Sequence, residues 1–321
     1  MISIEHLTKY YGDFRAVDDV SFTVKDGEIL GFLGPNGAGK TTTLKMLTCF
    51  MPPNEGTIRF NDFDVREHSM EIRKMIGYLP ENAPLYEYMG VIEFLNYVCD
   101  IREIYGQKRK ERIDRMIDLC GLEKVLGKDI GELSKGYRQR VGIAQAMIHE
   151  PDILILDEPT VGLDPNQVVG IRQLIKDVGE EKTVVLSTHI LSEVEAVCNR
   201  VVIISSGSIV ADGQTSVLMS ELAGQSVIRI VLKGNVPDAN MVFSTMKEVD
   251  RVDMSLEDDG NATCLDIFVR GAADMREEIF NRAVQKKWVL LEMTQQKKNL
   301  EDVFRKLTVS QSGVKQGGGA Q

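Results

Sequence analysis

One glycine-rich stretch near the N-terminus constrains this chain more than any other feature. It matches the pattern G-x-x-x-x-G-K-[ST] and lies between an apolar run, Ile29–Leu33, and a segment with helical apolar spacing, Thr42–Leu47. Its members are Gly34, Pro35, Asn36, Gly37, Ala38, Gly39, Lys40, Thr41 and Thr42. The order of strand, glycine loop and helix predicts a cradle for nucleotide phosphates.

The residue types in this loop explain the prediction. Glycines let the backbone turn tightly and direct its N–H groups inward, and the start of a helix adds partial positive charge. Lys40 is expected to reach the β- and γ-phosphates, and the hydroxyl of Thr41 is expected to hold Mg²⁺. The competing interpretation is a glycine-rich turn that begins an ordinary helix.

Two adjacent carboxylates follow a continuous apolar strand, Ile153–Leu156. The carboxyl ends of parallel strands are where open α/β sheets bind ligands. Asp157 is suited to binding Mg²⁺, and Glu158 to orienting or deprotonating an attacking water. His189 follows a similar strand and is a candidate contact for the γ-phosphate. The alternatives are surface acids at a strand end and a merely structural histidine.

Two further positions have side chains suited to a nucleotide. Ser134 and Gly136 begin a second predicted helix, where a capping hydroxyl and free N–H groups favour an anion; an ordinary N-cap is the alternative. Tyr11, at the end of the first predicted strand, could stack on a nucleobase, or it could be a solvent-facing turn tyrosine.

Composition narrows the class of protein. The net charge of −10 argues against a general nucleic-acid-binding surface, which needs clustered Lys and Arg. Five scattered cysteines without a C-x-x-C pair indicate neither disulfides nor a zinc site, and favour a cytoplasmic protein. We expect no signal peptide, and the apolar runs are too short to span a bilayer. Any action at a membrane is therefore expected to need a partner.

The pattern along the chain predicts two domains of α/β character. The first, residues 1–225, should have a core sheet, an antiparallel β subdomain and an α-helical insert at about 85–150. The second, residues 226–309, shows the order β-α-β-β-α-β of a ferredoxin-like domain, followed by a last helix at Leu300–Leu307. The tail, residues 310–321, has no apolar periodicity and is predicted to be disordered.

The order of these motifs closely resembles that of ATP-binding cassette (ABC) ATPases, over residues 1 to about 220. The resemblance implies a P-loop NTPase fold, with the glycine loop as Walker A motif and Leu133–Gln139 as signature motif. It also implies an adenine-stacking role for Tyr11, a D-loop at Gly162-Leu163-Asp164, and roles as Walker B acid, catalytic glutamate and switch histidine for Asp157, Glu158 and His189. The family usually has glutamine where this chain has Glu81; the carboxylate can still bind Mg²⁺ but adds charge and loses a donor.

The second domain resembles the C-terminal extension of ABC ATPases that serve ABC-2 type exporters, including multidrug and gliding-motility transporters; Asn299–Leu307 carries this likeness. The resemblance implies ATP and Mg²⁺ as ligands, transmembrane permease subunits as partners, and a location at the cytoplasmic face of the membrane. One cassette needs only one phosphate cradle, so Ser134 and Gly136 predict a head-to-tail pair, with itself or a related cassette, in which each chain completes the other's site. The alternatives are a soluble ABC ATPase acting on ribosomes or DNA, and a kinase, which would not explain the Ser134 helix start.

Overall fold

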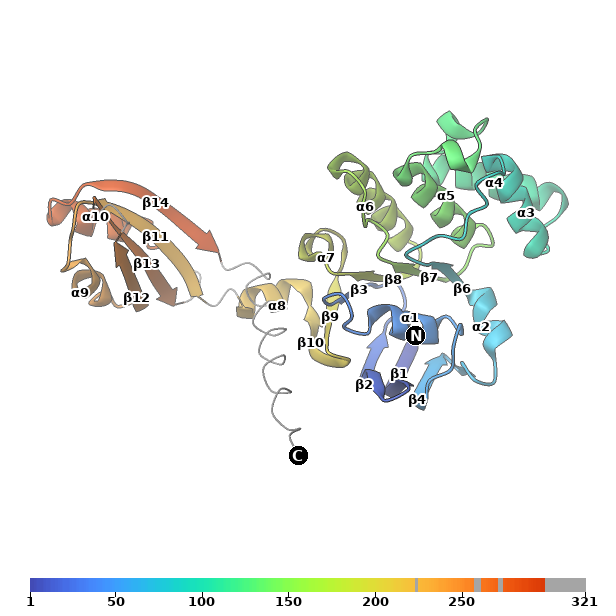
Figure 1. Cartoon of the computed structure of the whole chain (residues 1–321), viewed down its shortest axis with the longest axis horizontal. Helices are drawn as coiled ribbons and strands as arrows, with labels where there is room; N and C mark the ends of the chain where they lie inside the picture. The colour runs from blue at the N-terminus through green and yellow to red at the C-terminus, as the bar shows by residue number, and fades with distance from the viewer. Residues whose placement is uncertain (223–224, 257–260, 271–273, 298–321) are drawn as a thin grey trace. The chain divides into compact units, whose positions relative to one another are not determined.

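The computed structural model describes residues 1–222, 225–256, 261–270 and 274–297, and the chain divides into two compact units (Figure 1). The first unit is Met1–Thr215 and the second begins at Ser216. The sequence placed this border ten residues later, after helix α8 (Thr215–Leu222). Each unit has its own buried apolar cluster, so each is described separately.

A six-stranded sheet forms the centre of the first unit, in the order β10-β9-β3-β8-β7-β6. All neighbouring pairs are parallel except β9 and β10, which form a hairpin. Strands β3, β7 and β8 are buried along their whole length; β3 and β7 consist almost entirely of apolar residues, and β8 has an apolar centre, Val184–Leu186. The strands are β3 (Ile29–Leu33), β6 (Ile76–Leu79), β7 (Ile153–Asp157), β8 (Thr183–Thr188), β9 (Arg200–Ser205) and β10 (Ser208–Gln214).

A second, antiparallel sheet has the order β2-β1-β4-β5. Its alternating buried residues face an apolar cluster that is shared with helix α1 and the central sheet. Figure 1 shows α1 and this sheet on one side of the central sheet, with α6 and α7 on the other. The strands are β1 (Ile2–Tyr11), β2 (Phe14–Val24), β4 (Glu55–Phe60) and β5 (Phe63–Asp64).

The helices of the first unit include the predicted insert, which consists of α3, α4 and α5 with two short 3₁₀ turns between them. The predicted fold class, an α/β cassette with an antiparallel subdomain and a helical insert, is confirmed. The helices are α1 (Lys40–Leu47), α2 (Ser69–Met75), α3 (Val91–Ile101), α4 (Gly106–Cys120), η1 (Glu123–Val125), η2 (Ile130–Glu132), α5 (Lys135–Met147), α6 (Pro165–Gly179) and α7 (Leu191–Val197).

The second unit has the predicted β-α-β-β-α-β order, which is confirmed, in an antiparallel sheet ordered β12-β13-β11-β14. Its apolar side chains pack against helices α9 and α10. The elements are β11 (Gln225–Lys233), α9 (Ala239–Ser244), β12 (Val249–Leu256), β13 (Ala262–Arg270), α10 (Arg276–Gln285) and β14 (Leu290–Lys297). The predicted helix at Leu300–Leu307 and the predicted disordered tail lie outside the described residues.

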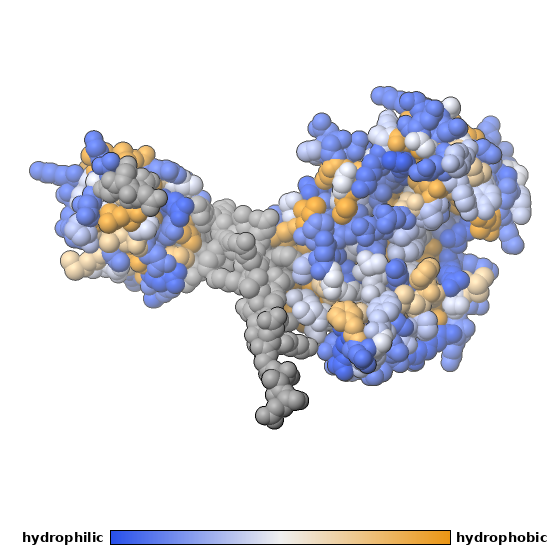
Figure 2. Space-filling model, viewed as in Figure 1, coloured by the Kyte–Doolittle hydropathy of each residue, from blue (hydrophilic) through white to orange (hydrophobic). Residues whose placement is uncertain are grey.

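The visible surface of each unit is mainly hydrophilic, with separate hydrophobic patches (Figure 2). Within the described part of the chain, we find no helix with the length and apolar character needed to cross a membrane. The five cysteines lie in the described part of the chain, and no disulfide joins any two of them.

Candidate functional site

The glycine loop connects β3 to α1 in a conformation that depends on glycine. Gly37 and Gly39 have φ of 78° and 107°, in the left-handed region that side chains disfavour. A Cβ on Gly39 would also lie 2.6 Å from the carbonyl oxygen of Ala16. Helix α1 begins at Lys40 without a side-chain cap, and the first N–H groups of a helix have no acceptor within it. The loop therefore has donors and a positive helix end with which to bind an anion.

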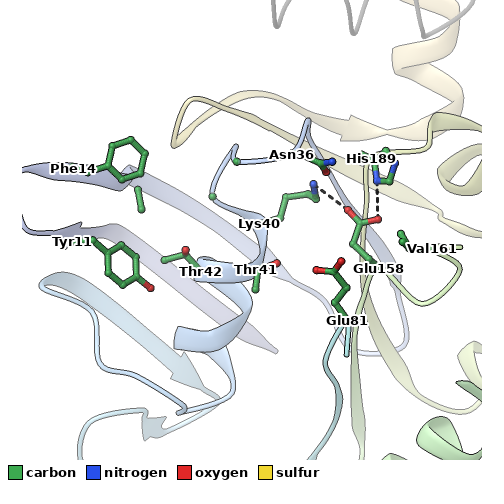
Figure 3. Close-up of a pocket in the computed structure, with 13 residues that line it drawn as sticks. Tyr11, Phe14, Asn36, Lys40, Thr41, Thr42, Glu81, Glu158, Val161 and His189 are labelled. Carbon is green, nitrogen blue, oxygen red and sulfur yellow. Dashed lines mark hydrogen bonds and ion pairs between the residues drawn. The ribbon is translucent and has the colours of Figure 1, made fainter. Parts of the chain in front are cut away.

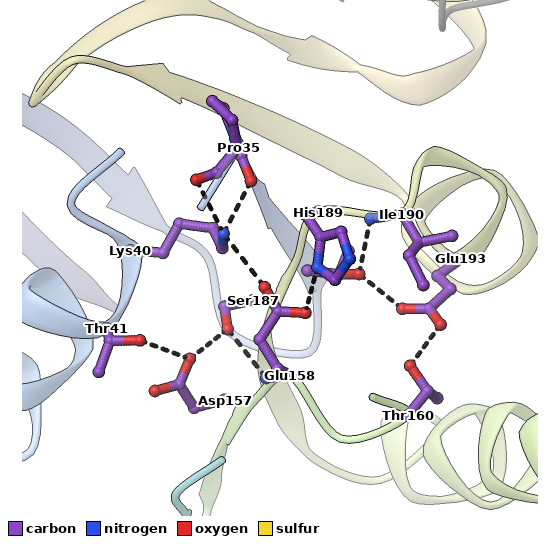
Figure 4. A network of polar contacts seen from close by, with 12 residues as sticks. Pro35, Lys40, Thr41, Asp157, Glu158, Thr160, Ser187, His189, Ile190 and Glu193 are labelled. Atoms are coloured by element: carbon purple, nitrogen blue, oxygen red, sulfur yellow. Dashed lines mark hydrogen bonds and ion pairs between the residues drawn. The ribbon is translucent and has the colours of Figure 1, made fainter. Parts of the chain in front are cut away.

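Lys40 is buried, with 5% of its surface exposed. Its Nζ donates to the carbonyl oxygens of Gly34 (2.7 Å) and Pro35 (3.2 Å), and lies 3.1 Å from Glu158 Oε1 (Figure 4). An ammonium has three N–H donors, so these contacts use all of them. A phosphate that binds Lys40 is therefore expected to take the place of one of these acceptors, and Glu158 is the only one of the three that is a side chain rather than a backbone carbonyl.

Asp157 ends strand β7 and has no exposed surface. Its Oδ1 accepts hydrogen bonds from Ser187 (2.5 Å) and Thr41 (3.3 Å), but its Oδ2 is buried without a partner. Burial raises the pKa of this carboxyl above its usual value, while the hydrogen bonds from Ser187 and Thr41 act in the opposite direction. A buried carboxylate oxygen without a partner, beside a threonine hydroxyl, fits the oxygen ligands that a divalent cation such as Mg²⁺ prefers.

Glu158 follows directly and connects the loop lysine to a histidine. Its φ of 49° is unusual for a residue with a Cβ, and its backbone N–H donates to Ser187 Oγ at 3.0 Å. The second carboxylate oxygen lies 2.9 Å from His189 Nδ1. Both oxygens of Glu158 are thus engaged, one by Lys40 and one by His189, and the side chain is 6% exposed.

The glycine loop, Lys40, Glu158 and His189 line one pocket of about 370 Å³ (Figure 3), and Asp157 lies buried directly before Glu158. Aromatic side chains, the glycine loop and the charged groups contribute to its wall, and the lining residues are Tyr11, Phe14, Ala16, Asn36, Gly37, Gly39, Lys40, Thr41, Thr42, Glu81, Glu158, Val161 and His189. Ten of these thirteen residues were predicted from the sequence as site residues. The fold thus brings together residues from five separate segments of the chain.

Tyr11 lines the pocket, is 47% exposed, and donates its hydroxyl to Met51 Sδ at 3.2 Å. Phe14, three residues later, is more exposed and lines the same wall. Sequence reasoning missed Phe14, although an aromatic in a tight turn next to Tyr11 was the available signal. The two rings leave an exposed aromatic surface on which a base could stack.

Seven predicted site residues are not among those that line this pocket. Gly34, Pro35 and Ala38 belong to the glycine loop and Asp157 directly precedes Glu158, whereas Ser134, Gly136 and Asp164 lie at the starts of two other helices. Ser134 is the N-cap of α5 and accepts from the N–H of Tyr137, while Asp164 is the N-cap of α6 and accepts from the N–H of Gln167. The starts of these helices touch, because a Cβ on Gly136 would lie 2.6 Å from the Gln167 side chain. The structure therefore groups these three residues with one another, apart from the pocket.

The chain is similar in sequence to ATP-binding proteins of ABC transporters. The family model described as "ABC transporter" matches residues 17–161. Two relatives from Bacillus subtilis (strain 168) are similar over most of their length. The ABC transporter ATP-binding protein YxlF is 39% identical over 221 residues, which is 69% of this chain and 73% of the relative. The linearmycin resistance ATP-binding protein LnrL is 33% identical over 235 residues, 73% of this chain and 76% of the relative.

Solved structures show the same likeness. One is a dimeric structure of a post-hydrolysis state of the ATP-binding cassette MJ0796, bound to ADP and Pi. It is 26% identical in sequence, with a TM-score of 0.61, and the match covers 67% of this chain and 98% of the MJ0796 chain. The structure of cbiO1 from Clostridium perfringens, part of the ABC transporter complex cbiONQ, has a TM-score of 0.64 at 28% identity and covers 69% of this chain and 91% of its own.

Proposed function

The chain belongs to the ABC transporter family as an ATP-binding and ATP-hydrolysing subunit, and on that premise we propose that it energises export through separate membrane subunits, working as a pair of chains. The observation that carries the proposal is the convergence of a buried lysine, two glutamates (Glu81 and Glu158) and a histidine on one pocket. Phosphoryl transfer to water needs mainly positioning and charge stabilisation, and this set of groups can supply both.

The loop and Lys40 are proposed to hold the phosphates. The free N–H groups at the start of α1 bind phosphate oxygens, and Lys40 neutralises their charge. Thr41, Asp157 and Glu81 would hold Mg²⁺, which would neutralise further charge on the phosphate oxygens. Tyr11 is proposed to stack on the adenine, with Phe14 beside it.

Glu158 is proposed to direct the attacking water. A carboxylate whose oxygens both have partners is poorly placed to accept a proton. When phosphates engage Lys40, Glu158 Oε1 loses its cation and becomes free to orient water and accept its proton. The hydrogen bond between His189 and Glu158 Oε2 remains, and it orients the carboxylate so that the freed Oε1 has a defined direction.

The positions of Ser134, Gly136 and Asp164 are the basis for proposing that two chains pair. They lie apart from the pocket of their own chain. Ser134 caps only one N–H group at the start of α5, and the other N–H groups of this first turn are suited to an anion. In a head-to-tail pair, either of two copies or with a related cassette, these residues would close over the nucleotide of the partner. The dimeric relative bound to ADP and Pi supports this arrangement.

The membrane partners and the direction of transport are also proposals. The relative cbiO1 is part of a transporter complex, and LnrL is named for resistance to linearmycin, which favours export. We therefore place this chain at the cytoplasmic face of the membrane, held there by permease subunits of the ABC-2 type. Five cysteines without a disulfide between them agree with a reducing compartment.

Light scattering of the Glu158→Gln variant tests the pairing. Glutamine has nearly the same shape as glutamate, so this variant should bind ATP, but it lacks the carboxylate that directs water and should hydrolyse ATP very slowly. In Mg-ATP the variant should therefore accumulate as a dimer. Adding Ser134→Arg should return it to monomer by crowding the interface, whereas Ser255→Arg, at an exposed serine of the second unit, should not. A monomer at saturating ATP and tens of micromolar protein would contradict the pairing of isolated chains.

A further inference from the structure

Helix α7 carries a buried acid that the proposed function does not use. Glu193 has only 1% of its surface exposed. One of its carboxylate oxygens accepts a hydrogen bond from Thr160 Oγ1, and the other accepts one from Thr188 Oγ1 at 2.6 Å (Figure 4). An ionised carboxylate can only accept, so both threonine hydroxyls must donate to it.

The two threonines belong to the two loops that carry the reacting groups. Thr160 lies two residues after Glu158, in the loop that follows β7. Thr188 ends β8 immediately before His189, and its hydroxyl also accepts the N–H of Ile190 at 3.0 Å. The chain on both sides of His189 is therefore fixed through one hydroxyl, which Glu193 holds in place.

We propose that Glu193 is a positioning residue that holds Glu158 and His189 at the separation their hydrogen bond requires. This contact spans 2.9 Å between loops from two different strands, and Glu193 is the side chain that hydrogen-bonds to both loops. The loop at Glu158 is in an unusual backbone conformation, with φ of 49°, which surrounding contacts have to maintain. The inference rests on the proposed function, because it concerns the residues assigned there to directing water.

A purely structural role explains Glu193 less well. Burying a carboxylate is costly even when it is hydrogen-bonded, and an apolar side chain of similar size would fill the same space without that cost. The neighbouring buried positions of α7, such as Leu191, Val194 and Val197, are apolar. An acid at this position is therefore best accounted for by the two loops that it joins.

Replacement by leucine separates the two roles. Glu193→Leu keeps the volume and removes both hydrogen bonds, while Glu193→Gln keeps one acceptor and should restore part of the activity. We expect kcat for ATP hydrolysis to fall roughly tenfold or more in the leucine variant, with the glutamine variant between it and wild type, and ATP affinity to stay within about twofold. Glu195→Leu, at an exposed acid on the same helix, is the matched control and should leave kcat unchanged.

The decisive readout is the coupling with His189. If Glu193 acts by positioning that histidine, Glu193→Leu should reduce kcat much less in a His189→Ala background than in wild type. An equal fold-loss in both backgrounds would overturn the proposal, as would a kcat within twofold of wild type, or a higher KM with unchanged kcat. Melting curves establish that the variants fold; if the leucine variant does not, the same cycle is run with Glu193→Gln. A wild-type protein without ATP turnover would refute the proposed function itself.

Discussion

Substituting Asp157 should stabilise the protein while removing its activity. This carboxylate has no exposed surface, and its Oδ2 has no hydrogen-bond partner in the protein. Asp157→Asn keeps an acceptor for Thr41 and Ser187 but replaces the orphaned charged oxygen with a neutral amide nitrogen. Because an unsatisfied buried group costs about 1–3 kcal/mol, and more when charged, the variant should gain about 1–2 kcal/mol net.

Thermal unfolding at pH 7, without nucleotide and with a chelator present, measures this gain. For a unit of this size, 1 kcal/mol corresponds to a shift of about 2–4 °C, so the transition of the first unit should move upward by roughly 2–8 °C. Asp152→Asn, at an exposed acid just before the same strand, is the control and should not move it. With Mg-ATP, turnover of the Asp157 variant should fall on the order of a hundredfold because the cation loses a ligand.

The stabilisation by Asp157→Asn should depend on pH. The folded-state pKa of Asp157 is raised, chiefly by burial, so the cost of its charge is fully present above that pKa. As pH falls from the folded pKa toward the unfolded value, the folded wild type takes up the proton first and recovers stability. The difference in free energy of unfolding between Asp157→Asn and wild type should therefore be largest near neutral pH and become smaller in acid. A variant that melts at or below the wild-type temperature at pH 7 would refute this reasoning.

Three further predictions concern other parts of the chain. Lys40→Ala should abolish ATP hydrolysis in a phosphate-release assay, whereas Lys45→Ala on the same helix should not; unchanged turnover without Lys40 would remove its assignment. Glu81→Gln should still bind ATP with similar affinity by fluorescence titration, because the carboxylate is one of several proposed Mg²⁺ ligands, and lost binding would show another role. A chain ending at Gln225 should fold and show an ATP-dependent rise in melting temperature; an insoluble product would contradict the independence of the first unit.

The sequence predicted most of the fold because local patterns and long-range packing agree in it. The short, continuous apolar runs Ile29–Leu33 and Ile153–Leu156 predicted buried strands. Both runs lie in buried strands of the central sheet. The glycine loop between β3 and α1 could also be predicted, because Gly37 and Gly39 occupy left-handed backbone conformations that are unfavourable for residues with a Cβ. The adjacent acids of β7 were recognised from their place at a strand end, where parallel strands bring their termini together.

Pairing between distant side chains could not be predicted in the same way. No local pattern shows that Lys40 contacts Glu158, because that contact depends on how β3 and β7 are placed in the sheet. Glu193 was missed for a related reason. A glutamate in a short helix has the spacing of a solvated residue, and only the convergence of the loops after β7 and β8 shows that it is buried. Such contacts are determined by tertiary structure rather than by periodicity.

Phosphate release by the Glu158→Gln variant tests the central claim most directly, namely that Glu158 directs the attacking water once phosphates have taken Lys40 from it. The measurement is single-turnover phosphate release at saturating Mg-ATP, with bound nucleotide quantified in the same samples. The account predicts ATP binding close to that of wild type and a release rate lower by about a hundredfold or more. Release at the wild-type rate, with ATP bound normally, would contradict it.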